Sequence, residues 1–153
     1  MSSDLVGIET SKYKSDYKPT NWRSIKIKHL STCLDGKRIP LNSSERSEMR
    51  GTIPYWGANC IVDYVNHHLF DEELILLGED GAPFFEPYRD VAFHINKKIW
   101  PNNHVHVLRP IKSKIEPVFL TYCLNSVTYE NYITGSTRDK LNQSDMNEIV
   151  ITA

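Results

Sequence analysis

The 153-residue sequence lacks several features that would define its class at once. It contains no run of about 18 apolar residues, which excludes a membrane-spanning helix and predicts no membrane partner. Cysteine is scarce: Cys33, Cys60 and Cys123 are odd in number and far apart, which excludes a disulfide framework and a zinc-binding C-x-x-C pair. The start of the chain lacks the basic-then-apolar order of a secretory signal. We therefore expect a cytoplasmic protein with reduced thiols, no bound metal and no other cofactor.

Catalytic signatures are missing as well, since the sequence has no G-x-S-x-G elbow, Walker loop, G-x-G-x-x-G or H-E-x-x-H. One enzyme hypothesis stays open, a metal-dependent nuclease or hydrolase that uses His104, His106 and the acids near 71–80. These two histidines are expected to share one face of a strand, a spacing equally typical of half-buried polar residues. His67 and His68 are expected to be surface residues, because adjacent side chains point apart. No intrinsic catalysis is expected.

The net charge of −1 conceals a separation of charge along the chain. Residues 63–88, the acidic block, carry seven acidic and no basic side chains, whereas residues 89–114 carry six basic and one acidic. Such asymmetry is typical of a protein with one face turned to a polyanion, although two solvated faces would give the same pattern. Two interpretations of the acidic block follow: it faces away from DNA, or it is the surface of a plain protein-interaction domain.

Short apolar segments between glycines and prolines predict an α+β fold, a single domain of short, mostly irregular β-strands with about two helices. Strands are expected at residues 51–57, 60–65, 74–77, 91–95, 105–108 and 149–151. The first should be irregular, because Pro54 lies inside it. Helices are expected at 42–50 and 116–126. Residues 1–17 are expected to form a poorly ordered leader and residues 18–153 the domain.

Polar connecting segments carry side chains suited to DNA. A loop is expected from Asn96 to Asn103, with cations, an indole and amides, and a second at residues 135–143. Lysine binds phosphate as a point charge, whereas arginine pairs with guanine and asparagine with adenine. Trp56 and Trp100 are expected in the core. The predicted phosphate contacts are Lys97, Lys98 and Lys140, with Lys37 adding charge. The predicted base contacts are Arg38, Arg89, Arg138, Asn59, Asn102 and Asn103.

Six short motifs occur in an order that resembles the target recognition domain of type I restriction-modification specificity subunits. They are KPTNWR at 18–23, DGKRIP at 35–40, GTIPYWGAN at 51–59, LLGEDG at 76–81, GSTRDKLN at 135–142 and DMNEIVI at 145–151. The motifs are distributed from residue 18 to residue 151, so the resemblance extends over nearly the whole predicted domain. Each motif is short and degenerate, but six of them in order are specific.

This resemblance implies recognition of a sequence in double-stranded DNA, with methylation and cleavage carried out by partner methyltransferase (modification) and restriction subunits. In the family, one such domain reads one half of a split target. A long helix after each domain spaces the two halves and docks the modification subunits. The sequence ends at residues 151–153, where that helix would be expected to start, so the resemblance leaves docking to these partners open.

Overall fold

The computed structural model describes residues 23–152. The leader expected at 1–17 and residues 18–22 of the first motif lie outside the described residues. The strands are β1 (Ser24–Lys26), β2 (Ser31–Cys33), β3 (Arg50–Trp56), β4 (Ile61–Val65), β5 (Phe70–Gly78), β6 (Ala92–Pro101), β7 (Val105–Pro110) and β8 (Val150–Thr152). The helices are α2 (Ser43–Ser47), α3 (Pro117–Ser126) and α4 (Gln143–Asn147), with 3-10 turns η1 (Ile27–His29) and η2 (Asp35–Lys37). The predicted α+β class is confirmed.

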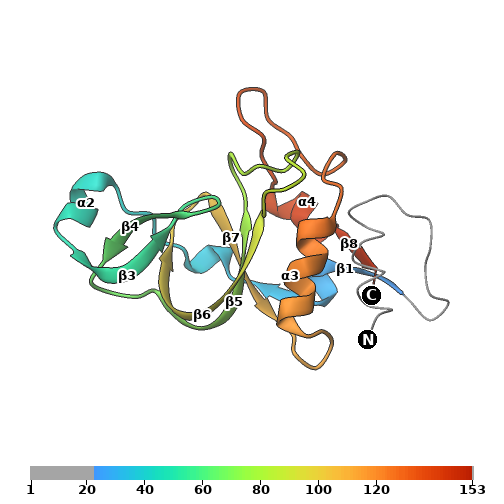
Figure 1. The fold of residues 1–153 in the computed structure, drawn as a ribbon, viewed down its shortest axis with the longest axis horizontal. Coiled ribbons are helices and arrows are strands. Elements are labelled where there is room, and N and C mark those ends of the chain that lie inside the picture. The colour runs from blue at the N-terminus through green and yellow to red at the C-terminus, as the bar shows by residue number, and fades with distance from the viewer. Residues whose placement is uncertain (1–22, 153) are drawn as a thin grey trace.

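Six of these strands form one sheet in the order β2-β7-β5-β6-β3-β4, and β1 pairs with β8 in a separate two-stranded sheet. Neighbouring strands are antiparallel, except that β3 and β6 run parallel where they pair. Figure 1 shows an elongated molecule with α2, β3 and β4 at one end and α3, α4, β1 and β8 at the other. Because β1 pairs with β8, the start and the end of the described region lie side by side.

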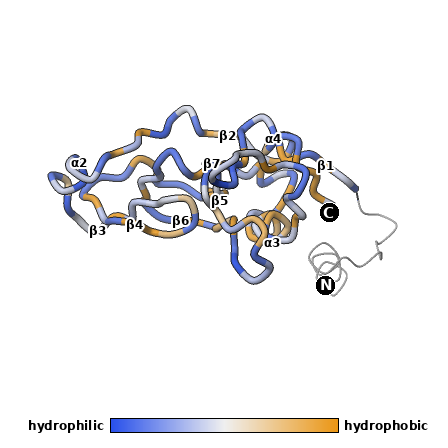
Figure 2. Tube along the Cα trace, turned by 90° about the horizontal axis from the view of Figure 1, so that it is seen from above, coloured by the Kyte–Doolittle hydropathy of each residue, from blue (hydrophilic) through white to orange (hydrophobic). Residues whose placement is uncertain are grey.

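The central strand β5 is covered on both faces, which explains why Leu74 to Leu77 are apolar without alternation. Ile75 and Leu77 belong to a core that also holds residues of α3, α4, β1 and β8. Leu74 and Leu76 belong to a second core on the opposite face, shared with β6 and β7. All four side chains are fully buried, and burying each contributes roughly 1.5–3 kcal/mol. Hydrophobic residues follow the strands and α3, whereas the connecting loops are mostly hydrophilic (Figure 2).

Both predicted helices are confirmed, and a third was not predicted. In α3, Pro117 occupies the first turn and the Glu116 carboxylate accepts the N–H groups of residues 118 and 119 at 2.7 and 3.2 Å. At the start of α2, Asn42 and Glu45 form a reciprocal capping box. The sequence indicates only a polar stretch at α4, because Met146 is its one buried residue and no apolar stripe marks it. Among residues 23–152, no helix is long and apolar enough to cross a membrane.

The loop predicted at residues 96–103 is wrong, because β6 continues without a break to Pro101. Asn96, Lys97 and Lys98 are exposed within this strand, opposite the acidic start of β5. The alternation of apolar and polar residues that marks a strand is therefore absent there. β5 and β6 have nine and ten residues, so the longest strands exceed the short ones expected. Trp56 and Trp100 are buried, as predicted.

Candidate nucleic-acid interface

Four connecting segments converge beyond the ends of β5, β6 and β7 and form one edge of the molecule. We call this edge the loop rim and define it as residues 57–60, 79–82, 102–104 and 134–141. It includes the long loop that projects at the top of Figure 1 and the start of the loop after β5, which is joined to it by a bridge between Asp80 and Lys140. Since each segment follows a different strand or helix, the rim exists only in the folded protein.

Backbone hydrogen bonds tie these segments to one another. The Asn102 N–H donates to the Trp56 carbonyl at 2.9 Å, which joins the turn after β6 to the end of β3. The Glu79 N–H donates to the His104 carbonyl at 2.9 Å. The Leu141 N–H donates to the Glu79 carbonyl at 2.7 Å. Main-chain atoms therefore fix the spacing of the segments, independently of the exposed side chains.

The loop rim brings together five of the residues that the sequence predicts as DNA contacts. Asn59 lies in the turn after β3, Asn102 and Asn103 lie in the turn after β6, and Arg138 and Lys140 lie in the last segment. Asn103 and Arg138 are exposed, and the other three are half-buried. Carboxamides and guanidinium groups can each form two hydrogen bonds to a base edge, so this set of groups suits a DNA groove.

Arg138 is presented by a tight loop. The backbones of Thr134 and Lys140 exchange two hydrogen bonds of 2.8 Å at the base of this loop. Gly135 has φ = 106°, and a Cβ there would lie 2.1 Å from the Arg138 carbonyl oxygen, so only glycine fits. The Arg138 guanidinium lies 3.1 Å from the Asp80 carboxylate and its side chain is 61% exposed. The arginine is thus oriented by an acid and still accessible.

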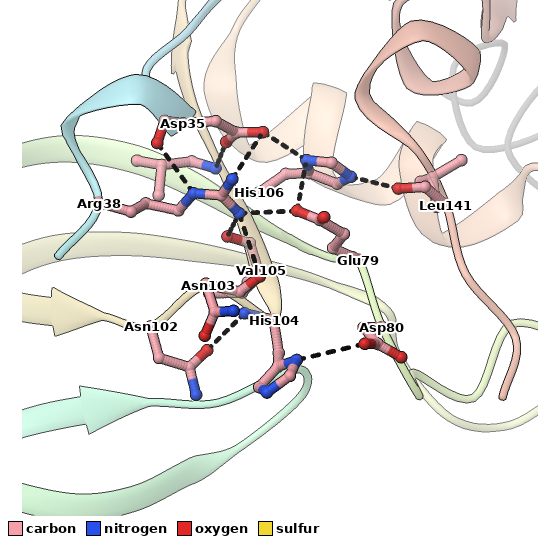
Figure 3. A network of polar contacts seen from close by, with 11 residues as sticks. Asp35, Arg38, Glu79, Asp80, Asn102, Asn103, His104, Val105, His106 and Leu141 are labelled. Carbon is pink, nitrogen blue, oxygen red and sulfur yellow. Dashed lines mark hydrogen bonds and ion pairs between the residues drawn. The ribbon is translucent and has the colours of Figure 1, made fainter. Parts of the chain in front are cut away.

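Beneath the rim lies His106, whose side chain is fully buried (Figure 3). Its Nδ1 is 2.6 Å from the Asp35 carboxylate, and its Nε2 is 2.6 Å from the Leu141 carbonyl oxygen. Carboxylate and carbonyl oxygens accept hydrogen bonds, so both ring nitrogens face acceptors and are placed to donate. The other Asp35 oxygen accepts the Val107 N–H at 2.8 Å.

Arg38 completes this buried cluster, and its side chain is 17% exposed. Its Nη1 donates to the Glu79 carboxylate at 2.7 Å and to the carbonyls of Asn103 and Val105 at 3.3 and 3.2 Å. Its Nε donates to the Asp35 carbonyl at 2.9 Å. The guanidinium predicted to contact a base is therefore already engaged within the protein.

The cluster sets the Arg38 guanidinium and the His106 ring against two carboxylates, Asp35 and Glu79. Burial alone would raise the pKa of Asp35. The hydrogen bond and charge of His106, the Val107 N–H and the charge of Arg38 outweigh burial and hold that pKa below its usual value. The Asp35 carboxylate is thus held in its ionised form.

The remaining predicted contacts lie outside the loop rim. Lys97 and Lys98 are in the middle of β6, opposite Glu72 and Asp71 of β5. Arg89 is exposed and lies 3.3 Å from Glu86, three residues earlier. Lys37 is exposed in η2, and no rim segment includes it. The structure therefore separates the ten predicted residues into a rim set, the half-buried Arg38 and scattered surface cations.

The acidic block is not a separate negative face, because six of its seven carboxylates have basic partners. Glu72 binds Arg109 at 2.6 Å, and Glu73 lies 2.6 Å from both Lys112 and His94. These contacts lower the pKa of both glutamates, mainly through the hydrogen bonds from Arg109 and Lys112. The other pairs are Asp63 with Arg46, Glu79 with Arg38, Asp80 with Arg138 and Glu86 with Arg89. Antiparallel pairing of β5 with β6 and β7 brings Glu72 and Glu73 to their basic partners, and the other four pairs form through loops, α2 and a local contact.

An edge of this composition on this fold agrees with a match to a known family. The family model described as the type I restriction modification DNA specificity domain matches residues 19–152. The chain belongs to this family. The match covers the whole described region, residues 23–152, and includes every segment of the loop rim.

Individual relatives of this specificity domain agree with the family. The sequence of this chain is 34% identical over 125 residues to a type I restriction enzyme specificity subunit of Haemophilus influenzae. The alignment covers 82% of this chain and 31% of the relative. The fold of this chain matches the type I S subunit of M. genitalium with a TM-score of 0.69 at 15% identity, covering 90% of this chain and 36% of that one. The HsdS subunit of Thermoanaerobacter tengcongensis gives a TM-score of 0.58 at 14% identity, covering 99% and 39%. The chain spans about a third of the length of these relatives.

Each histidine of the enzyme hypothesis lies near one acid of the segment 71–80, since His106 Nδ1 is 3.5 Å from Glu79 and His104 faces Asp80, but the two do not lie on one strand. His104 precedes β7 and its Nδ1 faces Asp80 at 3.5 Å, so His104 and His106 do not share a strand face as predicted. In the part of the chain that the structure describes, Asp35, Glu79 and His106 bring possible metal-ligand atoms within 4.8 Å of one another. Arg38 already supplies the positive charge between these carboxylates, which disfavours a cation there.

Sequence reasoning missed Asp35 and Glu79 as members of the buried cluster. Each stands beside a glycine in a segment typical of a solvated turn. A weak signal was present, because Asp35 follows Leu34 and His106 lies between Val105 and Val107. A polar side chain flanked by core residues needs a buried partner, but the sequence does not identify that partner.

Proposed function

We propose that this specificity domain reads a short sequence of duplex DNA through the loop rim. The observation that carries the proposal is the convergence of Asn59, Asn102, Asn103 and Arg138 from segments far apart in the sequence. Asparagine can pair with the N6 and N7 atoms of adenine, and arginine with the O6 and N7 atoms of guanine. The rim thus presents several groups that can bind base edges, on segments whose spacing is already fixed by backbone hydrogen bonds in the free protein.

The predicted contacts divide into three roles. Asn59, Asn102, Asn103 and Arg138 are assigned to base edges. Lys140, Lys97 and Lys98 are assigned to phosphates, because an ammonium is a point charge without a fixed fork. The exposed Arg89 and Lys37 lie outside the rim and are assigned to flanking phosphates. Arg38 is assigned to the support of the rim, because its donors bind Glu79 and backbone carbonyls.

We infer recognition without catalysis by this chain. The family is described by DNA specificity, and the solved structures that this fold resembles include a type I S subunit and an HsdS subunit. A third concerns complex assembly of the type I restriction-modification system. Methylation and cleavage are proposed to reside in partner modification and restriction subunits. The chain alone is expected neither to cleave duplex DNA with magnesium or manganese nor to transfer methyl groups from S-adenosylmethionine.

The proposal is tested by binding the full chain to duplexes with a randomised central segment and sequencing the bound fraction. We expect an enriched short sequence. Arg138→Ala should relax the preference at one position by roughly 1–3 kcal/mol. Arg89→Ala is the matched control, since both arginines are exposed and paired with an acid, at 61% and 55% exposure. If both variants change binding equally for all sequences, or if no sequence is enriched, the proposal fails.

A further inference from the structure

We propose that His106 and Arg38 are positioning residues for DNA recognition, each fixing a different segment of the loop rim. His106 sets the segment 134–141, which carries Arg138, and Arg38 sets the turn 102–104, which carries two amides. This inference rests on the proposed function of the rim. It concerns residues that lie beneath the surface and are not expected to touch DNA.

His106 connects the last rim segment to the sheet. Its Nε2 donates to the Leu141 carbonyl at 2.6 Å, three residues beyond Arg138. The ring cannot turn away, because Nδ1 is held by the Asp35 carboxylate at 2.6 Å and the side chain is fully buried. Asp35 is itself fixed by the Val107 N–H at 2.8 Å. A continuous chain of contacts thus runs from β7 through His106 to the loop of Arg138 (Figure 3).

Arg38 has the equivalent role for the turn between β6 and β7. Its Nη1 reaches the carbonyls of Asn103 and Val105 at 3.3 and 3.2 Å, on either side of His104. The same guanidinium binds Glu79 at 2.7 Å, and Glu79 joins the rim through its own backbone. Nη1 alone therefore holds two rim segments at a fixed separation, and Nε anchors the guanidinium to the Asp35 carbonyl. A lysine ammonium would end one bond short of the Nη1 position and would have no donor at Nε.

A role in geometry accounts for this cluster better than a role in stability. Removing a guanidinium, two carboxylates and an imidazole wholly or partly from water costs desolvation that their mutual attraction only partly returns, so apolar residues would often stabilise a core as well. A fully hydrogen-bonded buried network instead specifies one arrangement of the elements that it joins. Here His106 binds the Leu141 carbonyl, and Arg38 binds Glu79 and the carbonyls on either side of His104. Asp35 holds both His106 and Arg38 in place.

Two substitutions of His106 separate its two contacts. His106→Asn places its amide near the Nδ1 position and loses the donor to Leu141, whereas His106→Gln places its amide near Nε2 and retains that donor. In the free protein, His106→Asn should speed amide exchange at Lys140 and Leu141 roughly tenfold, as for one lost buried hydrogen bond. It should also relax DNA preference at the position that Arg138→Ala identifies. His106→Gln should do neither.

Arg38→Lys is the complementary variant, because it keeps the charge but ends one bond short of Nη1 and lacks the Nε donor to Asp35. It should speed exchange at Asn102 and His104, relax preference at other positions of the selected sequence, and leave residues 134–141 unchanged. This variant decides the question if both His106 variants fail to fold. Equal exchange in both segments for His106→Asn and Arg38→Lys would overturn the inference. If the wild type binds no DNA, the proposed function fails and the exchange data alone still decide whether the two residues position the rim.

Discussion

At the scale of single residues, Asp35 makes stability depend on pH. His106, Val107 and Arg38 hold its pKa below the usual value, so its contribution to the unfolding free energy is complete above about pH 4. The contribution is lost as the pH falls from there through the lowered pKa of the folded state. Urea unfolding between pH 6 and pH 3 should therefore show a steeper loss of stability for the wild type than for Asp35→Asn. Identical slopes would show that this carboxylate is not coupled to folding.

The exposed lysines of β6 test the assignment of phosphate contacts. Lys97→Ala or Lys98→Ala should weaken binding to all duplexes alike and reduce the slope of log affinity against log salt by about one. Lys26→Ala is a suitable control, because this lysine is exposed on β1 and is paired with Glu148. The measurement is a fluorescence titration at two salt concentrations. A change in sequence preference, or no change in the salt slope, would remove these lysines from the interface.

At the scale of elements, the loop that carries Arg138 depends on one glycine. Gly135→Ala would force a side chain into positive φ and against the Arg138 carbonyl, so the loop must change shape. We expect a loss of sequence preference comparable to that of Arg138→Ala, together with a lower melting temperature. Gly36→Ala is the control, because a Cβ there would meet no atom within 4 Å. Unchanged preference in Gly135→Ala would mean that the loop conformation does not matter for recognition.

Elements could be predicted from the sequence where one physical signal dominated. Pro117 and the apolar pattern after it marked α3, and the run Leu74–Leu77 marked the buried part of β5. The continuation of β6 through Lys97 and Lys98 could not be predicted, because those residues are exposed and their strand character comes from pairing with β5. Short α4 was missed for a similar reason, since it buries only Met146.

At the scale of the whole molecule, the fold determines which charged side chains become neighbours. Carboxylates of the acidic block form ion pairs with basic residues, such as Glu72 with Arg109. Charges that are separated along the sequence are therefore paired in the folded domain. Likewise, the sequence could nominate Asn59, Asn102 and Arg138 separately, but only the sheet order brings them to one edge. The cluster of Asp35 and His106 depends on the same long-range topology and had no local signal strong enough to predict it.

The most direct test of the loop rim as the DNA interface is an amide chemical-shift map of the isotope-labelled full chain. The chain would be titrated with the duplex recovered from the randomised pool. We predict that the largest changes fall in residues 57–60, 79–82, 102–104 and 134–141, and that they diminish in Arg138→Ala but not in Lys26→Ala, which removes an exposed side chain on β1 that is assigned no contact with DNA. If the largest chemical-shift changes fall along α3 or the β1–β8 sheet and the rim is unaffected, the loop rim is not the DNA interface.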